Sequence, residues 1–296
     1  MRVMTYNIQY GKGRDGRYDI GRIAETMAGA DIIGLQEVEA YWERSGDLHQ
    51  VEAIAERLRS YYWVYGATVD IHKGWVDANG RAHNRRRQFG NAILSRWPIL
   101  ATRTFLFPGK LSPVNAHSIQ RGITEATIET PLGHVRVYST HFSHLADEER
   151  IAHAQFALDL HRRAQADGPV SSGDHPDISW LENPPPAVLA EAILMGDLNM
   201  TPEGPVYPIL AGPQNRMYGR LRRNDGFVDA WLAAGRGEEE GATFYRDWAN
   251  KTGSRIDYIF VTPGLAGKIE GAEVLRDADA SDHQPLVVSF SEPDAR

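Results

Sequence analysis

The 296-residue sequence predicts a layered domain of the α/β or α+β class, built on a large and mostly antiparallel sheet system. Strand-like apolar segments occur along the whole chain, whereas helical periodicity is confined to a few segments. Hydrophobic residues make up 42% of the chain, which is enough for a full core. No internal repeat or compositional break marks a boundary, so residues 1–296 are expected to form a single domain.

The first third of the chain alternates between the two kinds of element. Residues Val3–Ile8 and Asp31–Leu35 are apolar runs typical of buried strands. Residues Tyr18–Ala28 and Leu48–Leu58 carry apolar side chains at helical spacing. Strands are then expected at Tyr61–Thr68 and Phe89–Ser95, on either side of a polar stretch.

The remaining elements follow from the same patterns. Residues Arg121–Glu129 and Val135–Phe142 are expected to form a hairpin over the turn at 131–134. Residues Glu148–Arg163 predict a long helix, and the Gly-, Pro- and Ser-rich stretch Gln165–Pro186 predicts a loop. The last expected elements are a strand beginning at Ala192, a helix over Phe227–Ala234, and strands over Ile256–Val261 and Leu286–Phe290.

Charge and composition exclude several classes of protein. The net charge is −7 and the pI is near 5.9, which argues against binding nucleic acid through bulk positive charge. The chain has no Cys, so neither a thiolate nucleophile nor a Cys-ligated zinc site is possible. We find no signal peptide and expect no transmembrane helix, so the expected location is cytoplasmic. Nothing in the pattern specifies an oligomeric state.

Polar side chains stand at the ends of six predicted strands. Any one of them is more often a turn former or a helix cap than a catalyst. Together they supply carboxylates, imidazoles and amides, without a Ser or Cys nucleophile at a matching turn. These residues are Asn7, Gln36 with Glu37, Thr140 with His141, Asp197 with Asn199, Asp257, and Asp282 with His283.

This set of side chains suits hydrolysis at phosphorus. A phosphate ester is anionic, so its hydrolysis needs a hard cation, a base for water and donors for the developing charge. Carboxylate and amide oxygens favour Mg²⁺ or Mn²⁺. The chain has no HExxH motif, which argues against a zinc-peptidase site.

The segment Met195–Pro202 illustrates how one strand end could serve this chemistry. Alternation would place Asp197 and Asn199 on the same side, with Leu198 turned into the packing. Gly196 would allow close packing, and Pro202 would end the strand. The carboxylate and the amide could then both contact one water and one phosphoryl oxygen.

The motifs of this chain, in their order, resemble those of the endonuclease/exonuclease/phosphatase superfamily. The resemblance extends from Met1 to about Phe290 and implies a four-layer αββα sandwich, with two packed sheets, helices outside and the site at one end of the sheets. The motifs are Thr5-Tyr6-Asn7-Ile8, Leu35-Gln36-Glu37-Val38, Ser139-Thr140-His141, Gly196-Asp197-Leu198-Asn199-Met200-Thr201-Pro202, Arg255-Ile256-Asp257-Tyr258-Ile259-Phe260 and Ser281-Asp282-His283-Gln284-Pro285.

The resemblance also implies roles for individual residues. Glu37 matches the principal Mg²⁺ ligand, Asn7 supports the metal or the phosphate, and Asp282 matches a further carboxylate of the metal site. Either Asp197 or His283 would be the general base, and the sequence leaves both open. The catalytic set that it implies is His141, Asp197, Asn199, Asp257 and His283, where Asp257 orients His283 and His141 donates to a phosphoryl oxygen.

Basic side chains are candidates for substrate binding. Arg87 ends the run Arg85–Arg87 in the polar stretch, and a solvated face is an equally good interpretation of that run. Arg121 stands at a strand entry and could reach the site. The run Arg220–Arg223 is better explained as a solvated face, and His144 is expected near the surface rather than at a metal.

Three functions remain open at this point. The favoured one is a Mg²⁺- or Mn²⁺-dependent hydrolase that cleaves a phosphodiester of a small or lipid-like molecule through an activated water. The alternative is a nuclease that acts on DNA or RNA, and the third is a non-catalytic protein that keeps the fold. Ser139-Thr140-His141-Phe142 is similar to sphingomyelinases and deoxyribonucleases rather than abasic endonucleases, which usually have Tyr in place of His141. The absence of Cys disfavours inositol polyphosphate 5-phosphatases.

Overall fold

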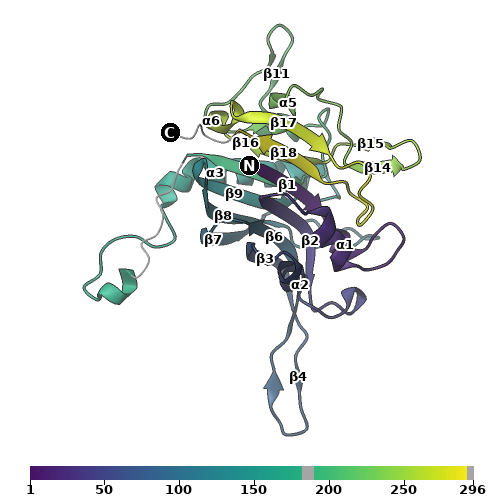
Figure 1. The fold of residues 1–296 in the computed structure, drawn as a ribbon, viewed down its shortest axis with the longest axis vertical. Coiled ribbons are helices and arrows are strands. Elements are labelled where there is room, and N and C mark those ends of the chain that lie inside the picture. Colours follow the sequence, from purple (N-terminus) through teal and green to yellow (C-terminus); the bar gives the residue numbers. More distant parts are fainter. Residues whose placement is uncertain (182–189, 292–296) are drawn as a thin grey trace.

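The computed structural model describes residues 1–181 and 190–291, which contain two six-stranded sheets packed face to face (Figure 1). Both sheets are mixed: β1 runs parallel to β2, β9 runs parallel to β10, and their other pairings are antiparallel. In spatial order, the first sheet consists of β17 (Ile269–Val274), β18 (Leu286–Phe290), β1 (Arg2–Asn7), β2 (Ile32–Ala40), β6 (Arg86–Ser95) and β3 (Tyr62–His72). The second consists of β13 (Val228–Asp229), β16 (Asp257–Val261), β10 (Ala192–Asp197), β9 (Gly133–His141), β8 (Gly122–Thr130) and β7 (Ile99–Leu106).

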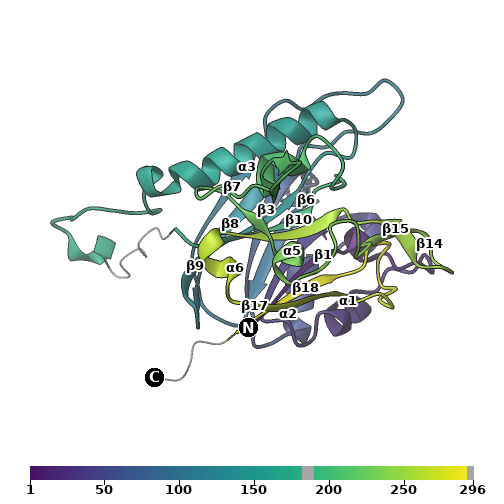
Figure 2. The same ribbon diagram turned by 90° about the horizontal axis from the view of Figure 1, so that it is seen from above.

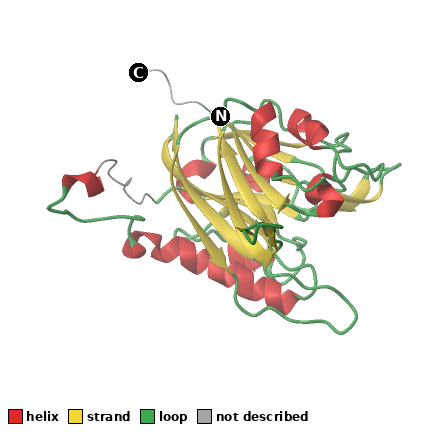
Figure 3. Ribbon diagram, turned by 90° about the horizontal axis from the view of Figure 1, so that it is seen from below, coloured by secondary structure: helices red, strands yellow, loops and turns green. Residues whose placement is uncertain are grey.

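Helices cover the outer faces of both sheets (Figures 2 and 3). Helices α1 (Ile20–Thr26) and α2 (Gln50–Arg57) lie on the first sheet. Helices α3 (Asp147–Asp167) and α4 (Tyr207–Ala211) lie on the second. The short helices α5 (Ala230–Ala233) and α6 (Pro263–Ala266) flank β16. In the described part of the chain, no helix has both the length and the apolar character needed to cross a membrane.

Strand alternation divides the apolar side chains among three interfaces. Ile32 and Ile193 point between the two sheets, whereas their neighbours Ile33 and Leu194 point outwards under the helices. All four side chains are fully or almost fully buried. Three separate apolar clusters therefore hold four layers together, and the predicted α+β four-layer sandwich is confirmed.

Most expected elements form near their predicted positions, and the differences have local causes. The predicted helix over Phe227–Ala234 is wrong in its first part, because Val228 and Asp229 pair with β16 as an edge strand. Asp229 then caps α5 by accepting a hydrogen bond from the backbone of Trp231 (2.9 Å). Helix α3 extends to Asp167, into the predicted loop Gln165–Pro186. Residues 178–181 of that loop form a 3₁₀ turn, and its residues 182–186 lie outside the described residues.

Several short elements were not expected from the sequence. Strands β7 and β17 are edge strands, and α4 is a single short helix. Three small two-stranded ribbons also form. They are β4 (Trp75–Val76) with β5 (Ala82–His83), β11 (Gln214–Asn215) with β12 (Gly219–Arg220), and β14 (Phe244–Asp247) with β15 (Thr252–Ser254).

The topology brings the six polar strand ends to one edge of the sandwich. Within the first sheet, Asn7 at the end of β1 is paired with Gln36. Within the second, Asp197 at the end of β10 is paired with both His141 and Asp257. Strand β18 enters the first sheet at this same end, directly after His283, because it runs antiparallel to β1. The chain folds so that polar groups far apart in sequence meet where the two sheets meet.

Candidate active site

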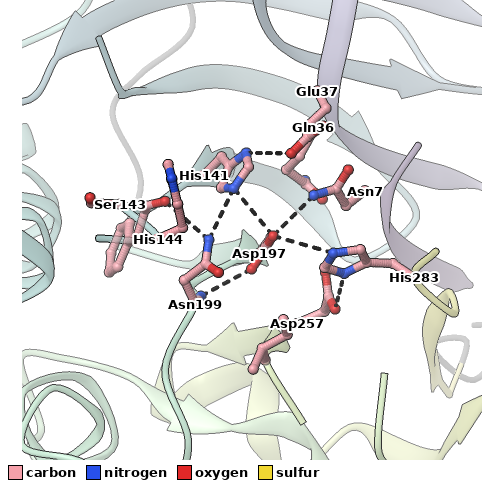
Figure 4. A network of polar contacts seen from close by, with 12 residues as sticks. Asn7, Gln36, Glu37, His141, Ser143, His144, Asp197, Asn199, Asp257 and His283 are labelled. Atoms are coloured by element: carbon pink, nitrogen blue, oxygen red, sulfur yellow. Dashed lines mark hydrogen bonds and ion pairs between the residues drawn. The ribbon is translucent and has the colours of Figure 1, made fainter. Parts of the chain in front are cut away.

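Asp197 lies at the centre of the polar network at this edge (Figure 4). Its Oδ2 accepts hydrogen bonds from Asn7 Nδ2 (3.0 Å) and His141 Nε2 (3.2 Å). Its Oδ1 accepts from the backbone amide of Asn199 (3.0 Å). Burial raises the pKa of Asp197, but its contacts with His141, His283 and Asn7 outweigh burial and hold the pKa below its ordinary value. The network therefore keeps a buried carboxylate ionised.

His141 is held in one tautomer. The guanidinium of Arg121 contacts Nδ1 of His141 (2.8 Å), and an arginine only donates, so Nδ1 accepts and Nε2 carries the proton. Burial and the Arg121 charge lower the pKa of His141 to about 4. His141 is consequently a neutral donor directed at Asp197. The sequence suggested that Arg121 could reach the site, and its guanidinium contacts His141 there. Its second terminal nitrogen lies 3.1 Å from Nδ1 of the exposed His144.

His283 lies against two carboxylates. Its Nδ1 is 2.8 Å from Asp257 Oδ2, and its Nε2 is 3.7 Å from Asp197 Oδ2. Burial lowers the pKa of His283, but these two carboxylates outweigh burial and raise it to about 10. The geometry thus favours an imidazolium whose Nε2–H points toward Asp197. The Oδ1 of Asp257 is buried and has no hydrogen-bond partner among the described residues.

Glu37 reaches this region because β2 contains a bulge. The register with β6 shifts between Leu35 and Val38, so that β2 carries one extra residue there. At the bulge Glu37 adopts a left-handed backbone conformation (φ 56°), which is uncommon for a residue with a side chain. Its carboxylate lies 4.0 Å from His141 Nδ1. The bulge thus turns the side chain of Glu37 toward the polar network.

The surroundings of Glu37 fit a bound cation. Burial raises the pKa of Glu37, and the nearby charges of Asp197 and Asp282 raise it further, against the lowering effect of Arg121 and His283. A divalent cation would offset this repulsion, and the donor set of carboxylates with the Asn7 amide suits Mg²⁺ or Mn²⁺. Asp282 is half-buried, and one of its oxygens accepts from Gln9 Nε2 (2.8 Å).

A second group of side chains has suitable spacing for a metal. One ligand atom from each of Asp197, Asp257 and His283 lies within 4.8 Å of the others. The hydrogen bond between His283 Nδ1 and Asp257 occupies one side of this group, and a protonated imidazole is not a ligand. These three residues are therefore arranged to share protons, whereas the carboxylate and amide oxygens near Glu37 have the chemistry that suits a cation.

Asn199 reaches His141 through a turn rather than through strand alternation. Strand β10 ends at Asp197, and Asn199 adopts a left-handed conformation (φ 47°), in which its Nδ2 lies 3.1 Å from His141 Nε2 and donates to the carbonyl oxygen of Phe142 (3.3 Å). Leu198, between them, is fully buried. A Cβ on Gly196 would lie 1.9 Å from the carbonyl oxygen of Thr140, so only glycine allows β10 to approach β9 this closely.

Arg87 lies beside the site rather than within the polar network. With Glu37 it lines a cavity of about 480 Å³, which we call the Arg87 pocket. Its neighbours Arg85 and Arg86 pair with Asp47 (2.7 Å) and Asp70 (2.6 Å). Arg87 forms no ion pair with any residue in the described ranges, and its Nε is buried without a partner. Of the basic run, only Arg87 offers an uncompensated charge to a ligand.

The sequence patterns missed most of the other residues of this pocket, among them three that lie in turns. Tyr10, Trp42 and Arg44 line it, and all three lie in turns after strands, where periodicity carries no signal. Arg44 stacks over Tyr10 (3.9 Å to the ring centroid) and pairs with the buried Glu39. The left-handed backbone at Tyr10 (φ 45°) marks an unusual position. This conformation is seen in the structure and has no signal in the sequence.

Comparisons with known proteins agree with this geometry. The family model described as Endonuclease/Exonuclease/phosphatase family matches residues 4–283. No curated protein sequence matches the chain.

Solved structures share the fold at low sequence identity. An endonuclease/exonuclease/phosphatase from Beutenbergia cavernae is 23% identical with a TM-score of 0.62, and the match covers 100% of this chain and 73% of that one. A mannosyl-6-phosphatase from Bacteroides thetaiotaomicron is 20% identical with a TM-score of 0.65, covering 98% and 99%. Truncated TDP2 from Caenorhabditis elegans is 20% identical with a TM-score of 0.57, covering 98% and 96%. The chain belongs to the Endonuclease/Exonuclease/phosphatase family, whose members are metal-dependent phosphoester hydrolases.

Proposed function

We propose that this protein hydrolyses a phosphodiester of a small organic molecule, with a divalent cation held by Glu37, Asn7 and Asp282. The observation that carries the proposal is the position of Asp197, which contacts His141 and Asn7 and faces the His283–Asp257 pair at one edge of the two sheets. Bound Mg²⁺ or Mn²⁺ would neutralise phosphoryl charge there.

In this mechanism Asp197 orients the attacking water and accepts its proton. The carboxylate is ionised and held by three donors, so it has a fixed direction. The water oxygen forms a bond to phosphorus as the bond to the ester oxygen breaks, and the alcohol leaves with a proton from solvent. His283 Nε2 lies 3.7 Å from Asp197, beyond hydrogen-bonding distance, so its proton is available to a phosphoryl oxygen. Asp257 keeps this ring oriented and charged. His141 and Asn199 hold Asp197 and the incoming water in place.

A small substrate is favoured over a polymer by the distribution of positive charge. A nuclease uses several uncompensated basic groups along the backbone of its substrate. Here Arg85 and Arg86 are paired with carboxylates, as is Arg220 with Glu238 in the other basic run. The cavity next to Glu37, which is open to solvent, has about the volume that small ligands occupy.

A substrate panel tests the proposal. Bis-p-nitrophenyl phosphate, p-nitrophenyl phosphate, single- and double-stranded DNA, RNA and a choline phospholipid would be assayed with Mg²⁺, Mn²⁺ and a chelator. We expect metal-dependent hydrolysis of the small diester, lost in Glu37→Gln and kept in Glu52→Gln, a matched change on the exposed face of α2. Activity that is indifferent to the chelator would contradict the mechanism. A preference for nucleic acid that falls steeply with salt would favour a nuclease instead.

A further inference from the structure

The Arg87 pocket is built from both halves of the sandwich. Its floor consists of two cross-strand pairs near the end of β3 and the start of β6, Val69 with Phe89 and Ile71 with Arg87. The lining also includes His117 and Ile119, in the segment that leads from β7 to Arg121. The same segment therefore contributes to the pocket and, two residues later, to the contact with His141.

The two arginines of the pocket differ in their charge balance. Arg44 is neutralised by Glu39, whose side chain is fully buried and also accepts from Ser45 (2.7 Å). Arg87 has no carboxylate partner in the described part of the chain. The pocket consequently has one uncompensated cation, Arg87, and an apolar floor beside it, in a cavity that Glu37 also lines.

The orientation of Arg87 is fixed by Trp42. The guanidinium lies over the indole ring, 4.5 Å from its centroid, and the indole is anchored by a hydrogen bond from Nε1 to the carbonyl of Gln88 (2.7 Å). Stacking uses the face of the guanidinium and leaves its in-plane N–H donors for a ligand. A planar cation that is held in this way is preorganised for a carboxylate or a phosphate.

We propose that the Arg87 pocket binds the part of the substrate that does not react, and that this part carries a second anionic group next to a ring or another apolar body. The second anion pairs with Arg87, and the apolar body lies on Val69, Ile71 and Phe89. This inference rests on the proposed function, since the phosphoryl group is taken to lie at the Glu37 end of the same cavity.

Binding of non-hydrolysable phosphonates tests the inference without turnover. Phenylphosphonate would be compared by calorimetry with 4-carboxyphenylphosphonate and 1,4-phenylenediphosphonate, in Mg²⁺, together with the corresponding two-ring biphenyl series. We expect a second anion to tighten binding roughly ten- to hundredfold in at least one series, as charge-assisted hydrogen bonds do. Whichever of the two ligands with a second anion binds more tightly identifies carboxylate or phosphate as the preferred group.

A matched pair of variants assigns the effect to Arg87. Arg87→Gln should abolish the advantage of the second anion and leave phenylphosphonate binding unchanged. Arg86→Gln removes the same charge from the preceding residue, which pairs with Asp70 and does not line the pocket. This control variant should keep the tighter binding of ligands with a second anion. Melting curves of both variants would report whether the fold is retained.

The results separate this inference from the proposed function. If no second anion improves binding, or if Arg87→Gln weakens all ligands equally, the inference is wrong even when bis-p-nitrophenyl phosphate is hydrolysed in a Glu37-dependent manner. If the advantage depends on Arg87 but no phosphoester is hydrolysed with any metal, the pocket assignment holds and the proposed function is wrong.

Discussion

Asp197 and Asp257 are direct partners in the antiparallel register of β10 and β16, so two buried carboxylates face each other across neighbouring strands. Like charges in this position destabilise a sheet. His283 relieves the repulsion by contacting both carboxylates, at 2.8 Å from Asp257 and 3.7 Å from Asp197. An arrangement that opposes sheet stability and needs a third residue for compensation is typical of a functional site.

The first prediction concerns this triad. Asp257→Asn keeps a hydrogen-bond acceptor for His283 but removes the charge that stabilises the imidazolium. We expect kcat to fall roughly 10²- to 10⁴-fold, with little change in the metal concentration needed for activity. Steady-state kinetics over a Mg²⁺ series would measure both, with the exposed Asp247→Asn on β14 as control. If the Mg²⁺ concentration needed for activity rises by a factor similar to the fall in kcat, the cation would instead lie among Asp197, Asp257 and His283.

The second prediction separates metal binding from folding at Glu37. Because burial, together with the charges of Asp197 and Asp282, raises the pKa of Glu37, Glu37→Gln should remove an unfavourable charge and raise the melting temperature of the metal-free protein. The same change should remove most of the stabilisation by Mg²⁺, and raise about tenfold or more the Mg²⁺ concentration at which the remaining stabilisation is half-maximal. Thermal melts with and without Mg²⁺ would test both effects. A variant that melts lower without metal and keeps the full Mg²⁺ shift would contradict this role.

The third prediction concerns the close contact of β9 and β10. Gly196→Ala places a methyl group 1.9 Å from the carbonyl oxygen of Thr140, so the strands must move apart at the site. We expect a loss in the free energy of unfolding of about 1–3 kcal/mol, together with a large fall in kcat. Urea denaturation measures the first. Gly267→Ala is the matched control, because its new methyl group would have no heavy atom within 4 Å, and it should leave both quantities unchanged.

The fourth prediction concerns acid stability. Burial lowers the pKa of His153 and of His161 to about 4, so both are neutral in the folded protein at pH 7. The unfolded chain takes up these protons near pH 6.5, so folding stability is fully present above that pH and falls as the pH drops toward 4. The loss by pH 5 should be on the order of 1–2 kcal/mol for each histidine.

Urea unfolding at pH 7 and pH 5 would measure this loss. His161→Gln keeps an acceptor for Arg136, which contacts His161 Nδ1 at 3.1 Å, and should reduce the pH dependence. The exposed His175→Gln should not change it. A variant at His161 with an unaltered slope would show that the residue is not a source of the acid sensitivity.

The sequence predicts those elements of the fold whose apolar side chains recur with the period of a strand or a helix. Buried strands such as β10 and helices such as α3 were predicted because their apolar pattern reflects a buried face. The edge strand β7 was missed, since Leu100 and Leu106 on its exposed side are apolar and blur the alternation. Polar strand ends could be listed, but only the topology brings Asn7 and Asp197, 190 positions apart, into contact.

Other features of the site depend on backbone geometry that no residue pattern encodes. The extra residue of β2 at Glu37 and the left-handed conformations at Tyr10 and Asn199 direct side chains to places that regular alternation would not reach. Arg87 was a candidate from its basic neighbours. Its distinctive property is that Arg85 and Arg86 are paired and it is not, and this depends on Asp47 and Asp70, which are distant in sequence.

The bulge of β2 makes strand length a functional property in its own right. Leu35 and Val38 pack under the same helices although they lie three positions apart, because the extra residue resets the alternation of side chains. Deleting one residue at Gln36–Glu37 would restore a regular ladder in which Val38 stays opposite Gly90, and it would remove the left-handed turn that directs Glu37. Relatives that shorten this strand by one residue would therefore keep the packing beyond it and lose the proposed cation ligand. A one-residue deletion at this point should cost activity more than stability.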